Sequence, residues 1–340
     1  MTAADARRPL SRVTARPLRG VVALVAGATR GAGRGIACML GEAGAVVYCS
    51  GRSTRAHPPA EGLYRGRTET IEETAEMVSR YGGEGIASRT DHLVPAEVEA
   101  LVDRIRRERG RLDVLVNDIS EGVLHDWAPF WKVSLDKGLE ALQRGVVSHV
   151  ITSRLAVPLM VESGGRLIVE IGDGDFLGYR STFFYDLVKA NVNRLAYAMA
   201  HDLAKHGIAS VAVTPGFMRT EYILDRLGVT EPSWRKAVKK NPHFAFSETP
   251  FFVGRAVAAL AADPRRMEKT GGLFASWTLS DEYGFSDVDG ARPHWGRHME
   301  SPAAKRAIPK TGRIPFEWRL VRRETPPPKR RRSHAAPARS

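Results

Sequence analysis

Residues 20–35 read GVVALVAGATRGAGRG, and this stretch decides the fold. It opens with a short apolar, β-branched run bounded by glycine, which is the pattern of a strand buried on both faces. Three glycines with the spacing GxxxGxG follow, and residues 34–44 then read as a helix. A glycine turn placed there brings backbone N–H groups against a pyrophosphate at a helix N-terminus. The predicted nucleotide-binding residues of this loop are Gly27, Thr29, Arg30, Gly31, Ala32 and Gly33.

Strand and helix signals alternate beyond this loop. Such regular alternation predicts a parallel sheet with helices on both faces, because right-handed crossovers require it. We therefore predict an α/β, Rossmann-like doubly wound sheet in a single domain at 18–299, with a helical lid at about 221–248. The predicted later strands are 45–50, 85–89, 111–117, 166–171, 208–214 and 271–276, and the predicted helices are 70–81, one starting at Pro95, 135–162, 184–206 and 250–263.

The formal charge of +13 belongs to the two ends of the chain. Residues 1–20 carry a net +4 and residues 300–340 a net +9, so the body between them is neutral. We expect basic tails at 1–17 and 300–340 that do not fold, because they are rich in charge and proline. A neutral body argues against dedicated nucleic-acid recognition, although contact of the tails with nucleic acid, membrane or an acidic partner stays open.

Composition also excludes several classes of protein. No run of about 18 apolar residues is present, so we expect no transmembrane helix. The first 20 residues contain arginines but no apolar core, which argues against a secretory signal. The two cysteines, Cys38 and Cys49, lack metal-ligand spacing and form no disulfide framework. We therefore expect a cytoplasmic protein without a metal site.

The residues after the second predicted strand indicate which dinucleotide fits. Folds that bind NAD place an Asp or Glu there to accept a hydrogen bond from the ribose 2′-OH. Here residues 48–55 read YCSGRSTR, with Arg52 and Arg55 and no acid. A guanidinium suits a 2′-phosphate, and Arg30 adds another cation, so we predict NADP(H) in preference to NAD(H), with Arg52 as a contact. The alternative that Arg52 and Arg55 only solubilise a loop stays open.

Over residues 18–280 the chain resembles the short-chain dehydrogenase/reductase family. The glycine loop matches the family's cofactor loop, and Tyr185 and Lys189 form its Tyr-xxx-Lys motif. The segment LVNDIS at 115–120 lies where the family has an Asn-Asn-Ala-Gly turn, with Asn117 kept and the next three residues changed. The resemblance implies cofactor contacts, besides the glycine loop, at Asp91, Asn117, Tyr185, Lys189, Pro215, Gly216 and Thr220.

Tyr185 and Lys189 lie four residues apart on a predicted helix, so both project from one face. A nearby ammonium lowers the pKa of a tyrosine from about 10 toward the working range. The resemblance implies that Tyr185 is the acid/base and that Lys189 also holds the nicotinamide ribose. The alternative that Tyr185 is a core aromatic stays open, because apolar residues continue the same stripe.

The chain departs from the family at two catalytic positions. The family's serine, 12 or 13 residues before the tyrosine, is replaced by Gly172 or Asp173, and its helix asparagine falls on Gly145. We predict Asp173 as a site residue, and we favour a neutral carboxylic acid that donates a hydrogen bond to a developing oxyanion. If ionised, Asp173 would instead oppose a Tyr185 phenolate and favour a cationic substrate. It could also merely cap a glycine-rich turn.

Two kinds of function follow. The leading hypothesis is an NADP(H)-dependent carbonyl reductase or alcohol dehydrogenase acting on a small, apolar substrate. The alternative is a catalytically weakened, nucleotide-binding protein that senses redox state or binds a partner. The resemblance implies a homodimer or homotetramer through the helices at 135–162 and 184–206. Four aromatic residues of the lid are expected to shape the substrate pocket, namely Tyr222, Trp234, Phe244 and Phe246.

Overall fold

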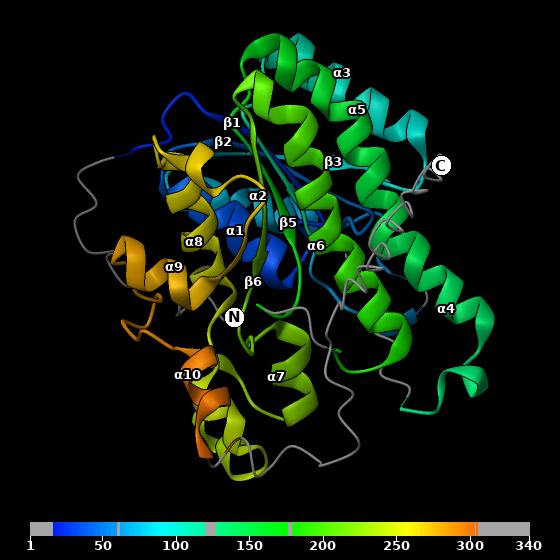
Figure 1. Ribbon diagram of the computed structural model, residues 1–340, viewed down its shortest axis with the longest axis vertical. Coiled ribbons are helices and arrows are strands. Elements are labelled where there is room, and N and C mark those ends of the chain that lie inside the picture. Colours follow the sequence, from blue (N-terminus) through cyan, green and yellow to red (C-terminus); the bar gives the residue numbers. More distant parts are fainter. Residues whose placement is uncertain (1–15, 60–61, 120–126, 176–178, 303, 305–340) are drawn as a thin grey trace, which may run out of the picture.

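The computed structural model describes residues 16–59, 62–119, 127–175, 179–302 and 304. Its centre is a sheet in which every pairing is parallel, in the order β3-β2-β1-β4-β5-β6-β7 (Figure 1). The predicted doubly wound sheet is therefore confirmed. The strands are β1 (Val22–Ala26), β2 (Val46–Gly51), β3 (Glu84–Arg89), β4 (Val114–Asn117), β5 (Leu167–Ile171), β6 (Ala209–Thr214) and β7 (Leu273–Ala275).

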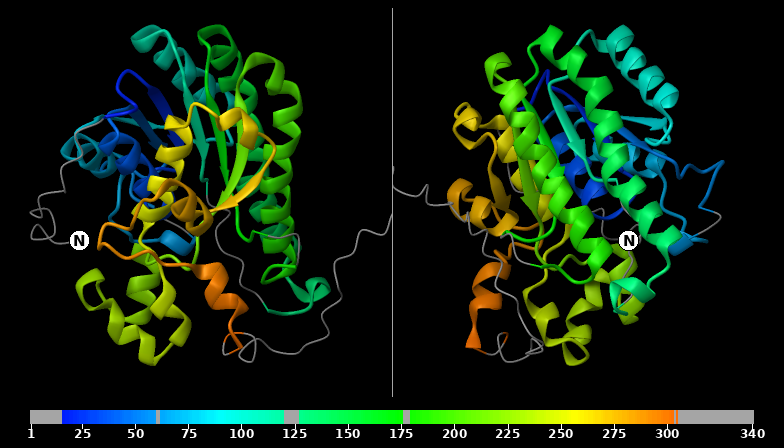
Figure 2. Two further views of the ribbon diagram at one scale, coloured as in Figure 1. Left: turned by 60° about the vertical axis from the view of Figure 1, so that its left-hand side comes forward. Right: turned by 45° about the vertical axis from the view of Figure 1, so that its right-hand side comes forward.

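Helices cover both faces of the sheet, which gives three layers (Figure 2). Helices α1, α2 and α8 contribute to the apolar core on one face, and α3, α5 and α6 to the core on the other. The helices are α1 (Gly31–Glu42), α2 (Ile71–Arg80), α3 (Pro95–Arg109), α4 (Leu135–Leu142), α5 (Ser148–Ser163), α6 (Phe183–Leu203), α7 (Glu221–Leu227), α8 (Pro250–Ala262), α9 (Ser276–Tyr283) and α10 (Trp295–Glu300).

Close packing against α8 fixes the position of α1, the helix that follows the glycine loop. A Cβ atom on Gly35 would lie 2.1 Å from the carbonyl oxygen of Pro250, and one on Gly254 would lie 2.5 Å from that of Gly35. Only glycines allow the two backbones to approach so closely. The start of α1 is thereby held at the point where the strand order reverses, between β1 and β4, where doubly wound sheets bind their ligands.

Several element boundaries differ from the predicted ones. Helix α1 begins at Gly31, three residues earlier than expected. The helix predicted over 135–162 is divided by a π-helical turn at Gln143–Val147, which contains Gly145. The lid is helical as expected, but it consists of α7 followed by the 3₁₀ segments Glu231–Lys239 and Pro242–Phe246.

The C-terminal part of the body holds helices that the sequence analysis did not predict. Helices α9 and α10 follow the last strand, and α10 lies beside the lid (Figure 1). Most of both predicted tails, at 1–15 and from 305 onward, lies outside the described residues. Within the described part, none of the helices has the length and hydropathy needed to cross a membrane.

Candidate active site

The glycine loop between β1 and α1 packs directly on the chain that follows β4. Gly27 has a φ of +93°, and a Cβ atom there would lie 2.2 Å from the carbonyl oxygen of Asp118. A Cβ atom on Gly33 would lie 2.3 Å from the carbonyl oxygen of Gly27. Thr29 and Ala32 are almost fully buried within the same turn. Side chains at Gly27 and Gly33 would force the turn apart, so both glycines are structurally required.

The loop presents its backbone N–H groups to anionic oxygens. The Gly31 amide donates to a Glu221 carboxylate oxygen at 2.9 Å, and the Gly33 amide donates to Asp118 Oδ2 at 2.5 Å. The N-terminus of α1 favours negative charge, because its first N–H groups have no partner within the helix. The Gly31 and Gly33 amides therefore form an anion-binding site, the glycine cradle, and such helix N-termini bind phosphate oxygens.

Arg52 and Asp91 lie together at the carboxyl ends of β2 and β3. One Arg52 guanidinium nitrogen is 3.7 Å from an Asp91 carboxylate oxygen, and about half of the Arg52 side chain is exposed. Arg55 pairs instead with Glu76, 2.6 Å away on the surface, which fits its interpretation as a loop residue. Arg52 is thus a cation next to Asp91, which is a predicted cofactor contact.

The Arg30 guanidinium contacts Tyr64 and Glu69, which come from the segment between β2 and α2. Its guanidinium lies 4.4 Å from the centre of the Tyr64 ring and 3.5 Å from a Glu69 carboxylate oxygen. Burial lowers the pKa of the Arg30 guanidinium, an effect that the charge of Glu69 opposes. The Arg30 side chain therefore contacts Tyr64 and Glu69 beside the glycine loop, and its contribution to binding a 2′-phosphate stays a prediction.

Tyr185, Lys189 and Asp173 come together where β5 ends and α6 begins. The Tyr185 hydroxyl donates to Asp173 Oδ2 at 2.8 Å, and Lys189 Nζ lies 5.7 Å from the centre of the Tyr185 ring. Arg180, which the sequence analysis did not single out, donates to Asp173 Oδ1 at 2.6 Å. Each oxygen of the Asp173 carboxyl group thus has its own partner, the hydroxyl on one and the guanidinium on the other.

Asn117 is fully buried at the end of β4, beneath this cluster. Its side-chain nitrogen donates to Glu170 at 2.7 Å and to Ser153 at 2.9 Å. Glu170 in turn pairs with His149 at 2.6 Å, and the other ring nitrogen of His149 lies 3.2 Å from the carbonyl oxygen of Ile119. Asn117 thus links the sheet to α5 through its side-chain nitrogen, and its contact with the cofactor stays a prediction.

The segment after β6 carries Pro215, Gly216 and Thr220 along the same edge of the sheet. Thr220 accepts a hydrogen bond from the Ile223 amide and caps α7. The Gly216 amide donates to Glu248 at 3.0 Å, and Glu248 is fully buried. Burial raises the pKa of Glu248 to about 8, so a neutral carboxyl group supports this segment from behind. Pro215 follows the last residue of β6, Thr214, whose hydroxyl donates to its carbonyl oxygen.

The four aromatic residues of the lid differ in their surroundings. Phe244 is fully buried, and Trp234 nearly so, in a core that the lid builds for itself. Phe246 stacks on His298 of α10 with 3.9 Å between the ring centres, and Tyr222 meets Tyr64 edge-on. Trp234 and Phe246 also line a pocket of about 460 Å³. Charged side chains line it as well, among them Arg219, Arg235 and Asp289, so it is not the apolar pocket that composition suggests.

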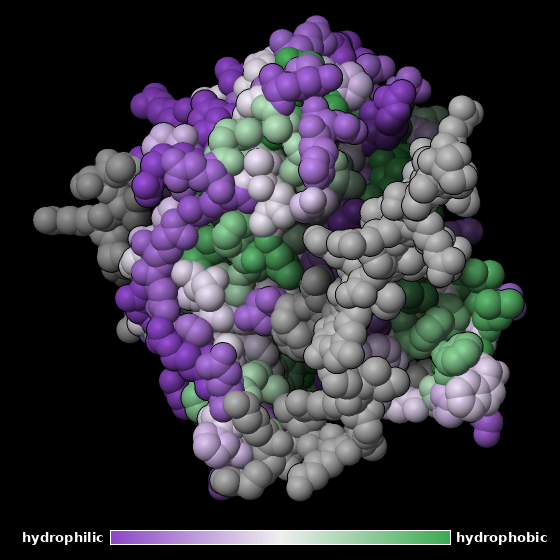
Figure 3. All heavy atoms as spheres, in the orientation of Figure 1, coloured by the Kyte–Doolittle hydropathy of each residue, from purple (hydrophilic) through white to green (hydrophobic). Residues whose placement is uncertain are grey.

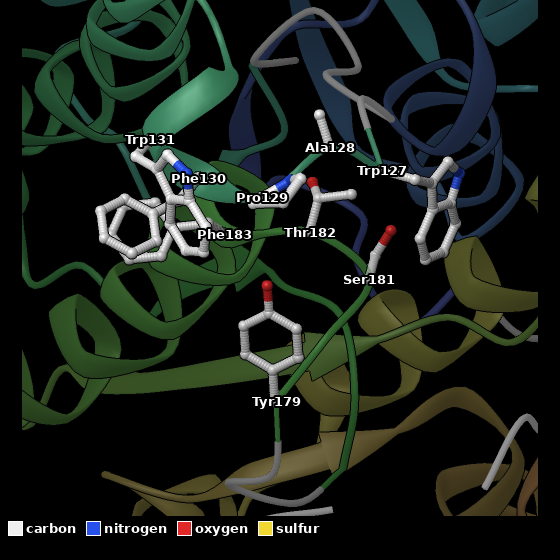
Figure 4. Close-up of a pocket in the computed structure, with 9 residues that line it drawn as sticks. All are labelled: Trp127, Ala128, Pro129, Phe130, Trp131, Tyr179, Ser181, Thr182 and Phe183. Atoms are coloured by element: carbon white, nitrogen blue, oxygen red, sulfur yellow. The ribbon is translucent and has the colours of Figure 1, made fainter. Parts of the chain in front are cut away.

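An aromatic pocket of about 320 Å³ lies instead beside the N-terminus of α6 (Figure 4). Its side chains come from two segments that flank the start of the helix, and Figure 4 shows Trp127 on one side, Phe130, Trp131 and Phe183 on the other, and the hydroxyls of Ser181 and Thr182 between them. None of the described residues that line it carries a formal charge. These lining residues are Trp127, Ala128, Pro129, Phe130, Trp131, Tyr179, Ser181, Thr182 and Phe183.

Comparisons with known proteins agree with this geometry. Residues 21–226 match the family model described as short chain dehydrogenase. The mouse protein named Dehydrogenase/reductase SDR family member 1 is 34% identical, over 81% of this chain and 85% of its own. The human protein of that name is 33% identical, over 81% and 86%. A solved structure of a short chain dehydrogenase from Mycobacterium thermoresistibile has a TM-score of 0.67 at 23% identity, over 82% of this chain and 92% of its own, and it supports the fold.

Proposed function

The chain belongs to the short-chain dehydrogenase/reductase family and is thus an NAD(P)-dependent oxidoreductase, and we propose that it transfers hydride between NADP(H) and a small, apolar carbonyl or alcohol. The observation that carries the proposal is the placement of Tyr185 and Lys189 on one face of α6, at the same edge of the sheet as the glycine cradle. A tyrosine beside an ammonium is suited to move a proton to or from a substrate oxygen.

The cradle fits a dinucleotide on chemical grounds. The Gly31 and Gly33 amides already bind carboxylate oxygens, and phosphate oxygens would take their place at the N-terminus of α1. Asp91 would hold the adenine end, and the segment with Pro215, Gly216 and Thr220 would hold the nicotinamide end. The bound cofactor supplies or accepts the hydride.

Preference for NADP(H) rests on Arg52. The end of β2 carries this half-exposed cation and no carboxylate of its own, since Asp91 comes from the end of β3. A guanidinium can bind a phosphate with two parallel hydrogen bonds, whereas a 2′-hydroxyl gives it no charge to neutralise.

A fluorescence titration with NADPH and NADH tests this proposal. We expect the wild-type protein to bind NADPH more tightly, and Arg52→Ala to weaken NADPH binding by roughly tenfold or more while NADH binding changes little. Arg55→Ala is the matched control, because Arg55 pairs with Glu76 on the surface. Preference for NADH in the wild-type protein would contradict the role of Arg52, and no binding of either cofactor would favour the partner-binding alternative.

Asp118 provides a second test of the cradle. Its carboxylate accepts the hydrogen bond of the Gly33 amide. A bound pyrophosphate must therefore displace the Asp118 carboxylate from this amide, and the two negative charges then lie close together. We expect Asp118→Asn to tighten NADPH binding by roughly tenfold at low salt, less at high salt. Asp202→Asn, an exposed change on α6, is the control. Unchanged or weaker binding by Asp118→Asn would show that the carboxylate does not compete with the cofactor.

Catalysis by the chain centres on one proton. In reduction, Tyr185 donates its hydroxyl proton to the substrate carbonyl oxygen, and in oxidation its phenolate accepts the proton of the alcohol. Lys189 stabilises the phenolate by its charge. Asp173 accepts the hydroxyl hydrogen bond before the substrate arrives and so holds the ring in place.

The substrate preference is supported by the aromatic pocket. Trp127 and Tyr179 are about three-quarters and two-thirds exposed, and both line the uncharged pocket next to the start of α6. Exposed aromatic faces, with no charged side chain among the described lining residues, favour an apolar, flat substrate through burial of its surface. We therefore place the substrate in this pocket rather than at the lid.

A homodimer or homotetramer is supported by an apolar surface over α4 and α5. Figure 3 shows hydrophobic side chains gathered at the lower right, where Figure 1 places α4. Exposed apolar patches on soluble domains mark interaction surfaces. The exposed members on α4, the following π-helical turn, α5 and α6 are Leu135, Leu139, Val147, Val150, Val161 and Tyr197.

A cytoplasmic location is supported by the cysteines. Cys38 and Cys49 are both free thiols buried in the core. Burial raises the pKa of the Cys38 thiol to about 12, so it holds its proton at neutral pH and is a poor nucleophile. Unpaired thiols are the usual state in a reducing compartment.

A further inference from the structure

Asp173 lies between two partners that use different oxygens of its carboxylate. The Tyr185 hydroxyl donates to Oδ2 at 2.8 Å, and Arg180 Nη2 donates to Oδ1 at 2.6 Å. Only about a quarter of either the Asp173 or the Arg180 side chain is exposed, so solvent screens the pair weakly. The acid/base tyrosine is therefore linked to a cation through the carboxylate.

Three features of the backbone hold Arg180 at this place. Ser181 has a φ of +58°, and it is the one non-glycine residue with a positive φ in the described part of the chain. The Arg180 amide donates to Asp186 Oδ1 at 2.6 Å, which ties the turn to the first turn of α6. A Cβ atom on Gly174 would lie 3.1 Å from Cδ and Nε of Arg180, so the missing side chain leaves room for the arginine. Such strain persists only where the surroundings fix it.

A carboxylate alone would harm a catalytic tyrosine. It repels the phenolate, and it accepts a hydrogen bond from the neutral phenol, so both effects oppose ionisation of Tyr185. A guanidinium on the same carboxylate cancels most of that charge. Of the other described charged groups near this cluster, Lys189 faces the ring, Asp175 is exposed, and Asp186 is held by the Arg180 amide.

We propose that Arg180 compensates the charge of Asp173, so that the Asp173–Arg180 pair acts as a neutral unit beside Tyr185, where the family places a neutral serine. This inference rests on the proposed role of Tyr185 as the acid/base. Arg180 is a positioning residue: it acts through Asp173 and keeps the Tyr185 proton transferable near neutral pH. It also anchors the carboxylate while the hydroxyl turns from Asp173 to the substrate oxygen.

The test follows ionisation of Tyr185 in the cofactor-free full chain by NMR with ¹³Cζ-labelled tyrosine. The chain has 8 tyrosines, and the signal missing from Tyr185→Phe identifies the one of interest. We expect Arg180→Met to move the ionisation midpoint of Tyr185 up by about 1 pH unit and Asp173→Asn to move it down by about 1 unit. The double variant should return to within about 0.3 units of the wild-type midpoint, because it removes both charges of the pair.

Two further variants control the experiment. Arg55→Met removes an arginine from a surface pair of the same 2.6 Å length and should leave Tyr185 unchanged. Arg180→Lys keeps the charge and should stay near the wild-type midpoint. Equal midpoints for the wild-type protein and a folded Arg180→Met would overturn the proposal.

The proposal remains testable if Arg180→Met fails to fold. Asp173→Asn and Arg180→Lys then carry the test, and an unchanged midpoint in Asp173→Asn, or one in Arg180→Lys raised by a full unit, would overturn it. Because the titration needs neither cofactor nor turnover, its failure is distinct from failure of the proposed hydride transfer.

Discussion

Replacing Tyr185 with Phe should lower turnover by about 10²–10⁴-fold while leaving NADPH binding within a factor of about three. The change removes a single oxygen, and that oxygen contacts Asp173 rather than the glycine cradle. The substrate carbonyl oxygen would then have no positioned proton donor, whereas the amides of Gly31 and Gly33 and the charge of Arg52 would be untouched.

The measurement follows NADPH oxidation with a panel of aliphatic and aromatic aldehydes and ketones, using the panel member that the wild-type protein reduces fastest. Tyr197→Phe is the control, because Tyr197 lies on the same helix with its ring exposed. Turnover by Tyr185→Phe within tenfold of wild type would remove Tyr185 from the acid/base role. Loss of NADPH binding would indicate a disturbed site instead.

The first βα unit was predictable because local chemistry dictates it. A strand buried on both faces must be apolar throughout. A Cβ atom on Gly27 or on Gly33 would lie within 2.5 Å of a backbone carbonyl oxygen, so both positions require glycine. The parallel, doubly wound sheet followed from the alternation of strands and helices. Such features depend on neighbours in sequence or on general rules of topology, so one chain suffices to recognise them.

Arg180 could not be predicted in the same way. It lies seven residues from Asp173, in a stretch whose path depends on the left-handed Ser181 and on a bond to Asp186. Nothing in the composition of that stretch tells a solvated arginine from one aimed at the carboxylate. The same holds for Glu170, whose partners Asn117 and His149 come from β4 and α5.

In the lid, composition alone predicts the wrong role for two of the aromatic residues. Aromatic residues in a polar segment suggested a substrate pocket, yet Trp234 and Phe244 pack 5.9 Å apart, ring centre to ring centre, in the lid's own core. A short insertion of 3₁₀ segments has little backbone regularity to stabilise it. It therefore needs large side chains for burial, and the two most exposed tryptophans lie elsewhere, at Trp127 and Trp131.

Glu248 is a further residue that the sequence did not reveal, and it couples the site to pH. Its Oε2 accepts hydrogen bonds from the Gly216 amide at 3.0 Å and from the Ser276 hydroxyl at 2.7 Å. No hydrogen-bond partner for Oε1 is found among the described residues, although the side chain is fully buried. A buried carboxyl group with so few donors holds its proton, because burial disfavours the charged form.

We therefore expect the free energy of unfolding to depend on pH through Glu248. Its pKa is raised from 4.5 to about 8 in the folded chain. Between these values the folded state binds a proton that the unfolded state has released, so stability falls as the pH rises through this range and levels off above it. Glu248→Gln cannot ionise, and it should exceed the wild-type protein in stability by about 4 kcal/mol at pH 8.5 while nearly matching it at pH 4.5.

Urea denaturation of both proteins at pH 4.5, 7 and 8.5 measures this difference, with Glu268→Gln, an exposed glutamate, as the control that should follow the wild-type protein. Parallel pH dependence of Glu248→Gln and wild type would mean that Glu248 is ionised in the folded state. In that case the Gly216 segment rests on a charged carboxylate. If Glu248→Gln is more stable than the wild-type protein at pH 8.5, raising the pH should destabilise the Gly216 segment first, because Glu248 contacts it directly. Binding of the nicotinamide cofactor should then weaken above pH 8 in the wild-type protein but not in Glu248→Gln.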